Sequence, residues 1–157
     1  FSPPGMPNTS STTQAQSEVA MNYELGYRFS NRHQSQIQAV LFRSDYTNLL
    51  GSDNISGGGL GTGELFNAGK ALVQGLELSA MCLIELKKLK NLNMPLQMSY
   101  TYTHATFSET FINGGGDWGS GQINSGDLIP FITPHLLSGS VGVEQQKWSA
   151  LLSTSRR

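Results

Sequence analysis

The chain has 157 residues and a formal net charge of −1, and 38% of its residues are hydrophobic while only 13% are charged. This length is enough for one domain with a sizeable core, and the near-neutral charge offers no basic surface that would bind nucleic acid. No apolar run reaches the roughly 18 residues of a transmembrane helix, and the single cysteine, Cys82, rules out an intrachain disulfide.

The first predicted strand covers residues 19–31, after a Pro-, Ser- and Thr-rich loop at residues 1–18. Apolar and polar side chains alternate strictly from Met21 to Ser30, and alternate side chains on a strand point to opposite faces. Roughly 9–11 residues cross a bilayer as a tilted barrel strand, whereas globular strands average about 5–6. We therefore predict a transmembrane strand with lipid on its aromatic face. The predicted lumen-facing residues of this strand are Asn22, Glu24 and Arg28.

Five further strands are predicted over residues 35–46, 67–81, 95–107, 133–144 and 148–157. In the first of these the alternation blurs between Val40 and Arg43, where a bulge could switch the faces. In the second, Leu76 and Leu78 share one face and Glu77 occupies the other. Glu77 is therefore also predicted to face the lumen.

Residues 82–93 allow two interpretations, because Glu85 and three lysines are interspersed with leucines. By propensity the segment could be a short helix. The alternative is a frayed strand end followed by a basic turn, and we favour this second interpretation.

The predicted connections run long, short, long, medium, long and short along the chain. Glycine is concentrated in the long connections at residues 47–66 and 108–131, whereas residues 31–34 and 145–147 form tight turns. Outer-membrane barrels have short periplasmic turns and long extracellular loops, and a β-sandwich has no reason to sort its loops by end. The predicted fold is therefore all-β, an antiparallel meander of about six long strands in the wall of a transmembrane β-barrel.

Four stretches, residues 22–28, 67–78, 100–107 and 127–135, resemble the TonB-dependent outer-membrane receptors that import ferric siderophores, ferric citrate and cobalamin. Residues 1–5 and 127–135 are most similar to the ferric citrate branch. The resemblance implies a 22-stranded barrel in the bacterial outer membrane, with an N-terminal plug domain and a segment that contacts TonB. In these terms residues 1–157 are a partial barrel, and the plug domain and the terminal strands are absent from the chain.

About six strands cannot close a transmembrane barrel, since about eight is the smallest number known. An open edge in lipid would leave backbone N–H and C=O groups unpaired, at several kcal/mol each. The chain begins at Phe1 and ends at Arg157 inside a predicted strand, and we therefore expect it to be a segment that does not insert alone.

No catalytic constellation is predicted, and no cofactor is implied. His33, His104 and His135 are scattered, with no partner at metal-ligand spacing, so no metal site is expected. Asp117 and Trp118, at a glycine-flanked loop tip, are the best candidates for ligand contact, and the alternative is a solvated loop.

The predicted function is that of a receptor, not an enzyme, which binds a ferric chelate and imports it with energy delivered through TonB. Its surroundings would be outer-membrane lipid and lipopolysaccharide. The alternatives are a passive porin-type barrel and a soluble β-sandwich that binds carbohydrate. An acidic mouth would repel a ferric citrate anion, unless arginines on other strands reverse the charge, and it could instead bind divalent cations among lipopolysaccharide head groups. The acidic residues in or beside the long loops are Glu18, Asp45, Asp53, Glu64, Glu109, Asp117 and Asp127.

Overall fold

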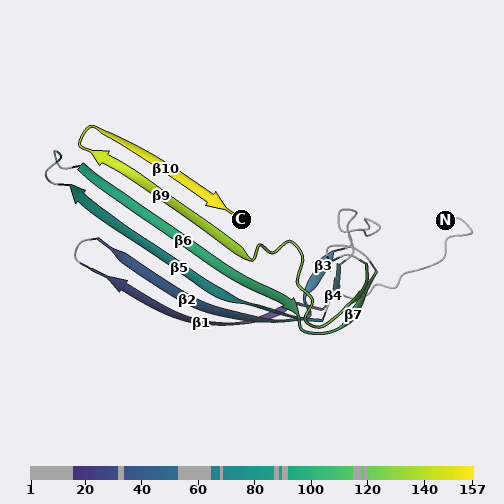
Figure 1. The fold of residues 1–157 in the computed structure, drawn as a ribbon. Helices are drawn as coiled ribbons and strands as arrows, with labels where there is room; N and C mark the ends of the chain where they lie inside the picture. Colours follow the sequence, from purple (N-terminus) through teal and green to yellow (C-terminus); the bar gives the residue numbers. More distant parts are fainter. Residues whose placement is uncertain are drawn as a thin grey trace, which may run out of the picture.

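The computed structural model describes residues 16–31, 34–52, 65–67, 69–86, 89, 92–114, 118 and 120–157. Six long strands form one antiparallel sheet in the order β1-β2-β5-β6-β9-β10, and each pairs with the next long strand along the chain (Figure 1). The strands are β1 (Val19–Ser30), β2 (Gln36–Thr47), β5 (Lys70–Leu86), β6 (Leu92–Phe107), β9 (His135–Gln145) and β10 (Trp148–Arg156). The predicted antiparallel meander is confirmed.

Two short hairpins lie within the long connections of the sheet. They are formed by β3 (Leu50–Ser52) with β4 (Leu65–Asn67), and by β7 (Phe111–Gly114) with β8 (Ser120–Ile123). Both long connections lie at one end of the sheet, which we call the loop end, and the short connections lie at the opposite, turn end (Figure 1). The predicted sorting of loops by end is therefore present in the structure.

The sheet is longer at the turn end than the sequence pattern indicated. β5 continues to Leu86 and β6 begins at Leu92, so residues 82–86 are strand and not helix. The reason is cross-strand pairing: Cys82 lies opposite Leu96 and Ile84 lies opposite Met94, and this pairing outweighs helix propensity. The backbone N–H of Leu89 donates to the carbonyl of Leu86 at 2.9 Å and helps to close the turn.

The bulge considered above for residues 40–43 is not present, because β2 pairs with β1 and with β5 in unbroken register from Gln36 to Thr47. Phe42 therefore lies on the same face as Glu24, directly opposite Gly75. A Cβ atom at Gly75 would meet the Phe42 ring at 2.6 Å, so the missing side chain at Gly75 makes room for the ring. The alternation in the sequence is blurred because Phe42, an apolar residue, lies on the polar side of β2 and packs over Gly75.

The register divides the side chains of the six strands between two faces. We call the face with Tyr23, Leu41 and Leu76 the apolar face, and the face with Glu24 and Glu77 the polar face. The exposed large apolar side chains of these strands lie on the apolar face, except Met81, Leu136 and Leu151.

The sheet is a single curved layer (Figure 1). Within the described ranges no second layer packs on the apolar face, and Leu25 remains 72% exposed. A β-sandwich buries one face of each sheet against the other, so this arrangement does not fit the carbohydrate-binding sandwich considered above.

The buried hydrophobic side chains of the described chain gather at the loop end and its hairpins. They are Ala71, Ala105, Phe107 and Ile123. The part of the chain that the structure describes contains no helix long and apolar enough to cross a membrane.

Candidate functional site

The four residues predicted to face a lumen all lie on the polar face. Glu24 and Arg28 are two pleats apart on β1, and Glu77 on β5 lies between Val40 and Thr101. Arg28 donates from Nη2 to Oε1 of Gln38, its cross-strand neighbour, at 3.1 Å. All four side chains are exposed: Asn22, Glu24, Arg28 and Glu77.

A belt of small hydroxyl side chains crosses the polar face toward the turn end. Ser99 Oγ and Ser138 Oγ are hydrogen-bonded at 2.6 Å, and Ser79 and Ser155 continue the same row. Part of this row and the next row toward the turn end line a shallow depression of about 360 Å³. Among its lining residues are Gln97, Ser140 and Ser153. The sequence interpretation missed this belt, although serines at alternate positions of β9 and β10 are its signal.

Trp118 is held in an aromatic cluster at the loop end. Its ring lies 5.5 Å from Phe107 and 6.3 Å from Phe111, and the two phenylalanine rings are 5.3 Å apart, all edge to face. Phe107 is only 2% exposed. The indole of Trp118 is itself half-buried, and its contacts with the two rings hold the β7–β8 connection against the end of β6. Its sequence neighbour Asp117 lies outside the described residues.

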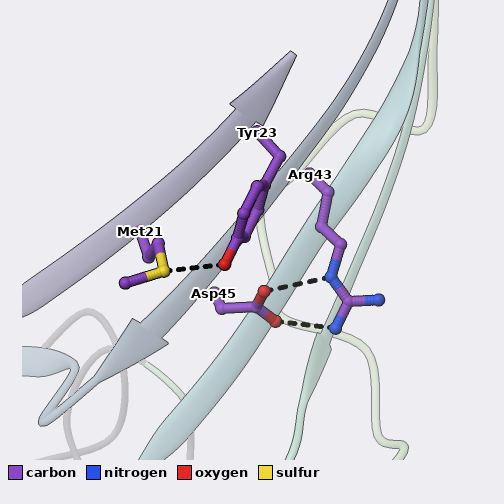
Figure 2. Close-up of polar contacts among 4 residues, drawn as sticks. All are labelled: Met21, Tyr23, Arg43 and Asp45. Carbon is purple, nitrogen blue, oxygen red and sulfur yellow. Dashed lines mark hydrogen bonds and ion pairs between the residues drawn. The ribbon is translucent and has the colours of Figure 1, made fainter. Parts of the chain in front are cut away.

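Three of the acidic residues near the loops are engaged in local bonds. Glu18 accepts a hydrogen bond from the backbone N–H of Leu50 at 3.0 Å, and Asp127 accepts one from that of Asn124 at 2.7 Å. Asp45 binds Arg43 through two hydrogen bonds of 3.0 and 2.8 Å on the apolar face (Figure 2). Asp53 and Glu64, like Asp117, fall outside the described ranges.

Asn67 ties three segments of the loop end together. Its side-chain Nδ2 donates to the carbonyls of Gln16 at 3.0 Å and of Asn48 at 2.9 Å, while its Oδ1 accepts from the Gln16 N–H at 2.7 Å. The side-chain amide of Asn67 thereby links the residues before β1 and the end of β2 to the end of β4.

The histidines that the structure describes do not form a metal site. His135 is hydrogen-bonded through Nδ1 to the hydroxyl of Tyr100 at 2.9 Å, and its ring lies 5.2 Å from that of Tyr102. Across the described part of the chain, no group of three His, Cys, Asp or Glu residues could hold a metal ion. His33 lies outside that part.

The height of the apolar face matches that of the apolar band of outer-membrane barrels. From Leu76 to Leu86, β5 rises about 33 Å at roughly 3.3 Å per residue. At a strand tilt of about 40°, this length spans about 25 Å, the height of the apolar band of outer-membrane barrels. Tyr102 and His135 lie on this face toward the loop end, and Trp148 lies at the turn end. Aromatic residues flank such bands at both interfaces.

A family model described as TonB dependent receptor-like, beta-barrel, matches residues 1–156. No curated protein and no solved structure matches the chain significantly. The family match covers nearly the whole chain and agrees with a meander of long strands whose loops are sorted by end. The chain therefore belongs to the β-barrel family of the TonB-dependent receptors, which are TonB-linked transporters of the bacterial outer membrane.

Proposed function

We propose that this chain is part of the barrel wall of a receptor that binds a ferric chelate, a ferric siderophore or ferric citrate, and imports it with energy from TonB. The observation that carries the proposal is the division of a single-layer sheet into an exposed apolar face and a hydrophilic face. Lipid would contact the first and a water-filled lumen the second. TonB would act on the receptor's N-terminal plug region.

The polar face suits a hydrated lumen. A charged side chain on the lipid face costs roughly 2–4 kcal/mol at the bilayer midplane, so charges in this part of a wall belong where water reaches them. Glu24, Arg28 and Glu77 are exposed on the polar face, with Asn22 and the serine belt beside them. We propose that these residues line the passage and bind water or the receptor's own plug.

The loop end would frame the extracellular mouth. The aromatic cluster fixes the base of the β6–β9 connection, because Phe107 ends β6 and Trp118 lies between β7 and β8. We propose that Trp118 positions this connection at the mouth and that its neighbour Asp117 contacts the ligand.

The local bonding of the acidic residues supports an anionic chelate. Asp45 is paired with Arg43 and lies on the apolar face, so its charge is neutralised away from the proposed passage. Glu18 and Asp127 accept backbone N–H bonds. The Arg43–Asp45 ion pair therefore removes one of the negative charges whose repulsion would act on ferric citrate. Import of a chelate breaks no covalent bond, so the proposed activity is transport and not catalysis.

Uptake of radiolabelled iron tests the proposal. A strain that expresses the receptor as its single ferric-chelate transporter would be supplied with ferric citrate or a defined siderophore, with and without TonB. We expect uptake of one chelate that stops when TonB is removed. Uptake that persists without TonB would instead show a passive porin, and no uptake of any ferric chelate would refute the proposed ligand class.

A further inference from the structure

The ladder between β6 and β9 is interrupted near the turn end of the sheet. From Tyr102 to Leu96, each residue of β6 pairs with a residue of β9, and pairing then resumes at Asn93. Of the β9 residues that the structure describes, none pairs with Met94 or Pro95. On its other side, the same stretch of β6 pairs with β5 without a break. We call this local interruption between β6 and β9 the seam.

Pro95 accounts for the seam. Proline has no backbone N–H, and in sheets it is largely confined to edge strands, strand starts and bulges. Pro95 instead lies in an interior strand with a neighbour on each side. A Cβ atom at Gly142 on β9 would approach Pro95 Cγ to 2.8 Å. The proline ring therefore lies against the β9 backbone, which accommodates it because residue 142 has no side chain.

Apolar side chains cover the seam on the polar face. Leu83 on β5 lies opposite Pro95, and Leu151 on β10 lies opposite Gly142. Leu151 Cδ1 is 3.4 Å from the position that a Cβ atom would take at Gly142. Leu151 is 71% exposed, although it lies on the hydrophilic face of the sheet. The apolar row thus screens the interrupted pairing from water on that face.

The seam separates the ends of two hairpins. β5 and β6 form one hairpin and β9 and β10 form the other, and their turn ends lie side by side (Figure 1). Only the ladder between β6 and β9 joins these two hairpins within the described sheet. Beyond the seam, that ladder consists of the pair Asn93–Glu144. Segments with few cooperative contacts open locally more often than segments in a continuous ladder.

We propose that the wall opens locally along this seam. The turn end of the β9–β10 hairpin separates from that of the β5–β6 hairpin, the Asn93–Glu144 pair breaks, and the Leu96–Val141 pair is the pivot. The seam borders the shallow depression on the polar face, at the end of the wall opposite the mouth. Opening would therefore widen the passage where an imported chelate leaves it. This role in transport rests on the proposed function, whereas the opening itself requires no ligand.

Amide hydrogen exchange of the full receptor, without ligand, tests the opening. We expect residues 142–145 to exchange faster than residues 138–141, which pair continuously with both neighbouring strands. Pro95→Val restores an N–H and removes the ring, and it should slow exchange in 142–145 about tenfold. The matched control is Gln97→Val, the same new residue two positions along β6, which should leave exchange unchanged. Equal exchange of the two segments, or equal slowing by both variants, would overturn the proposal.

Two pairs of cysteines, each introduced with Cys82→Ala, test the role in transport. Asn93→Cys with Glu144→Cys joins β6 to β9 beyond the seam, and Gln97→Cys with Ser140→Cys joins the same strands within the continuous ladder. Directly opposite residues have Cα atoms about 4.5–5.5 Å apart, a separation that a disulfide can span. Oxidation of the first pair should slow uptake of ferric citrate or the defined siderophore about tenfold, and a reductant should restore it. The oxidised second pair should transport like the wild type.

The combined results distinguish the possible failures. Binding of the chelate at the cell surface should be equal in both oxidised receptors, because the mouth lies at the opposite end of the wall. Unimpeded uptake after oxidation of the Asn93–Glu144 pair, or equal inhibition by both pairs, would refute the role of the seam in transport. No uptake by the unmodified receptor would refute the proposed function together with that role, while hydrogen exchange would still decide whether the wall opens.

Discussion

The loop end and the middle of the sheet are stabilised in different ways. At the loop end, Phe107 and Ala71 are almost fully buried, and Asn67 joins three segments through its side-chain amide. In the middle of the sheet, between the loop end and the turn end, the edge strands β1 and β10 expose every side chain and are held by the backbone ladders to β2 and β9. The loop end thus carries a small core of its own, whereas the middle depends on what surrounds its two faces. This dependence is expected in the wall of a membrane barrel, where one face of the sheet contacts lipid and the other faces the barrel interior.

The largest effect is expected in the aromatic cluster. Phe107→Ala removes a ring that is 2% exposed, and such truncations cost about 3–5 kcal/mol. The matched control is Phe131→Ala at the same end, where the ring is 89% exposed and the cost should stay within about 0.5 kcal/mol. Protease cleavage of the β6–β9 connection and Trp118 fluorescence measure the difference. Equal cleavage of the two variants would show that the loop end has no core of its own.

The apolar and polar faces in the middle of the sheet can be compared by introducing one arginine on each face. Leu25→Arg on the apolar face should destabilise the receptor by roughly 2–4 kcal/mol if the residue lies near the midplane. Asn22→Arg on the polar face should be much milder, because water can hydrate the new charge. Denaturant titration of the receptor in lipid bilayers measures both, and equal tolerance at the two sites would contradict the membrane assignment.

Gly75 and Gly26 both lie in paired strands, but neighbouring atoms approach Gly75 much more closely than Gly26. At Gly75, a Cβ atom would collide with the Tyr102 carbonyl oxygen and approach Phe42 Cζ to 2.6 Å. Gly75→Ala should therefore cost about 1–3 kcal/mol, the usual range for overpacking. At Gly26, the nearest atom to an added Cβ is Val40 Cγ2 at 3.7 Å, an ordinary contact. Gly26→Ala is the control, and a cost there that matched Gly75→Ala would mean that strand geometry alone penalises both changes.

Much of the fold could be predicted because alternation and loop length are local signals. The strict pattern from Met21 to Phe29 assigns the two faces, and the structure places the side chains accordingly. The extension of β5 to Leu86 could not be predicted, because residues 82–86 gain their strand conformation from pairing with β6 and not from their own propensities.

The contacts at the loop end could be predicted less well from the sequence. They join residues of different segments, and no repeating pattern in the sequence links one segment to the other. Phe107 ends a strand and Trp118 follows a run of glycines, so nothing in the intervening pattern indicates that their rings touch. Arg43 and Asp45 show the opposite case. They are two residues apart in a predicted strand, which places them on one face. The position of Asp45 near the strand end nevertheless groups it, by sequence alone, with the acidic residues of the loops.

The smallest effect concerns the polar junction of the loop end. Asn67→Ala removes three hydrogen bonds, to Gln16 and Asn48, and leaves backbone groups to rebind water, since Asn67 is only partly buried. We expect a cost of about 1–2 kcal/mol, because each such bond contributes about 1 kcal/mol and solvent recovers part of it. Asn22→Ala, which alters an exposed amide in the middle of β1, is the control and should be close to neutral. Amide hydrogen exchange around β3 and β4 should rise in Asn67→Ala and not in Asn22→Ala. Unchanged exchange in both would mean that the backbone ladder, and not the side-chain amide, holds the loop end together.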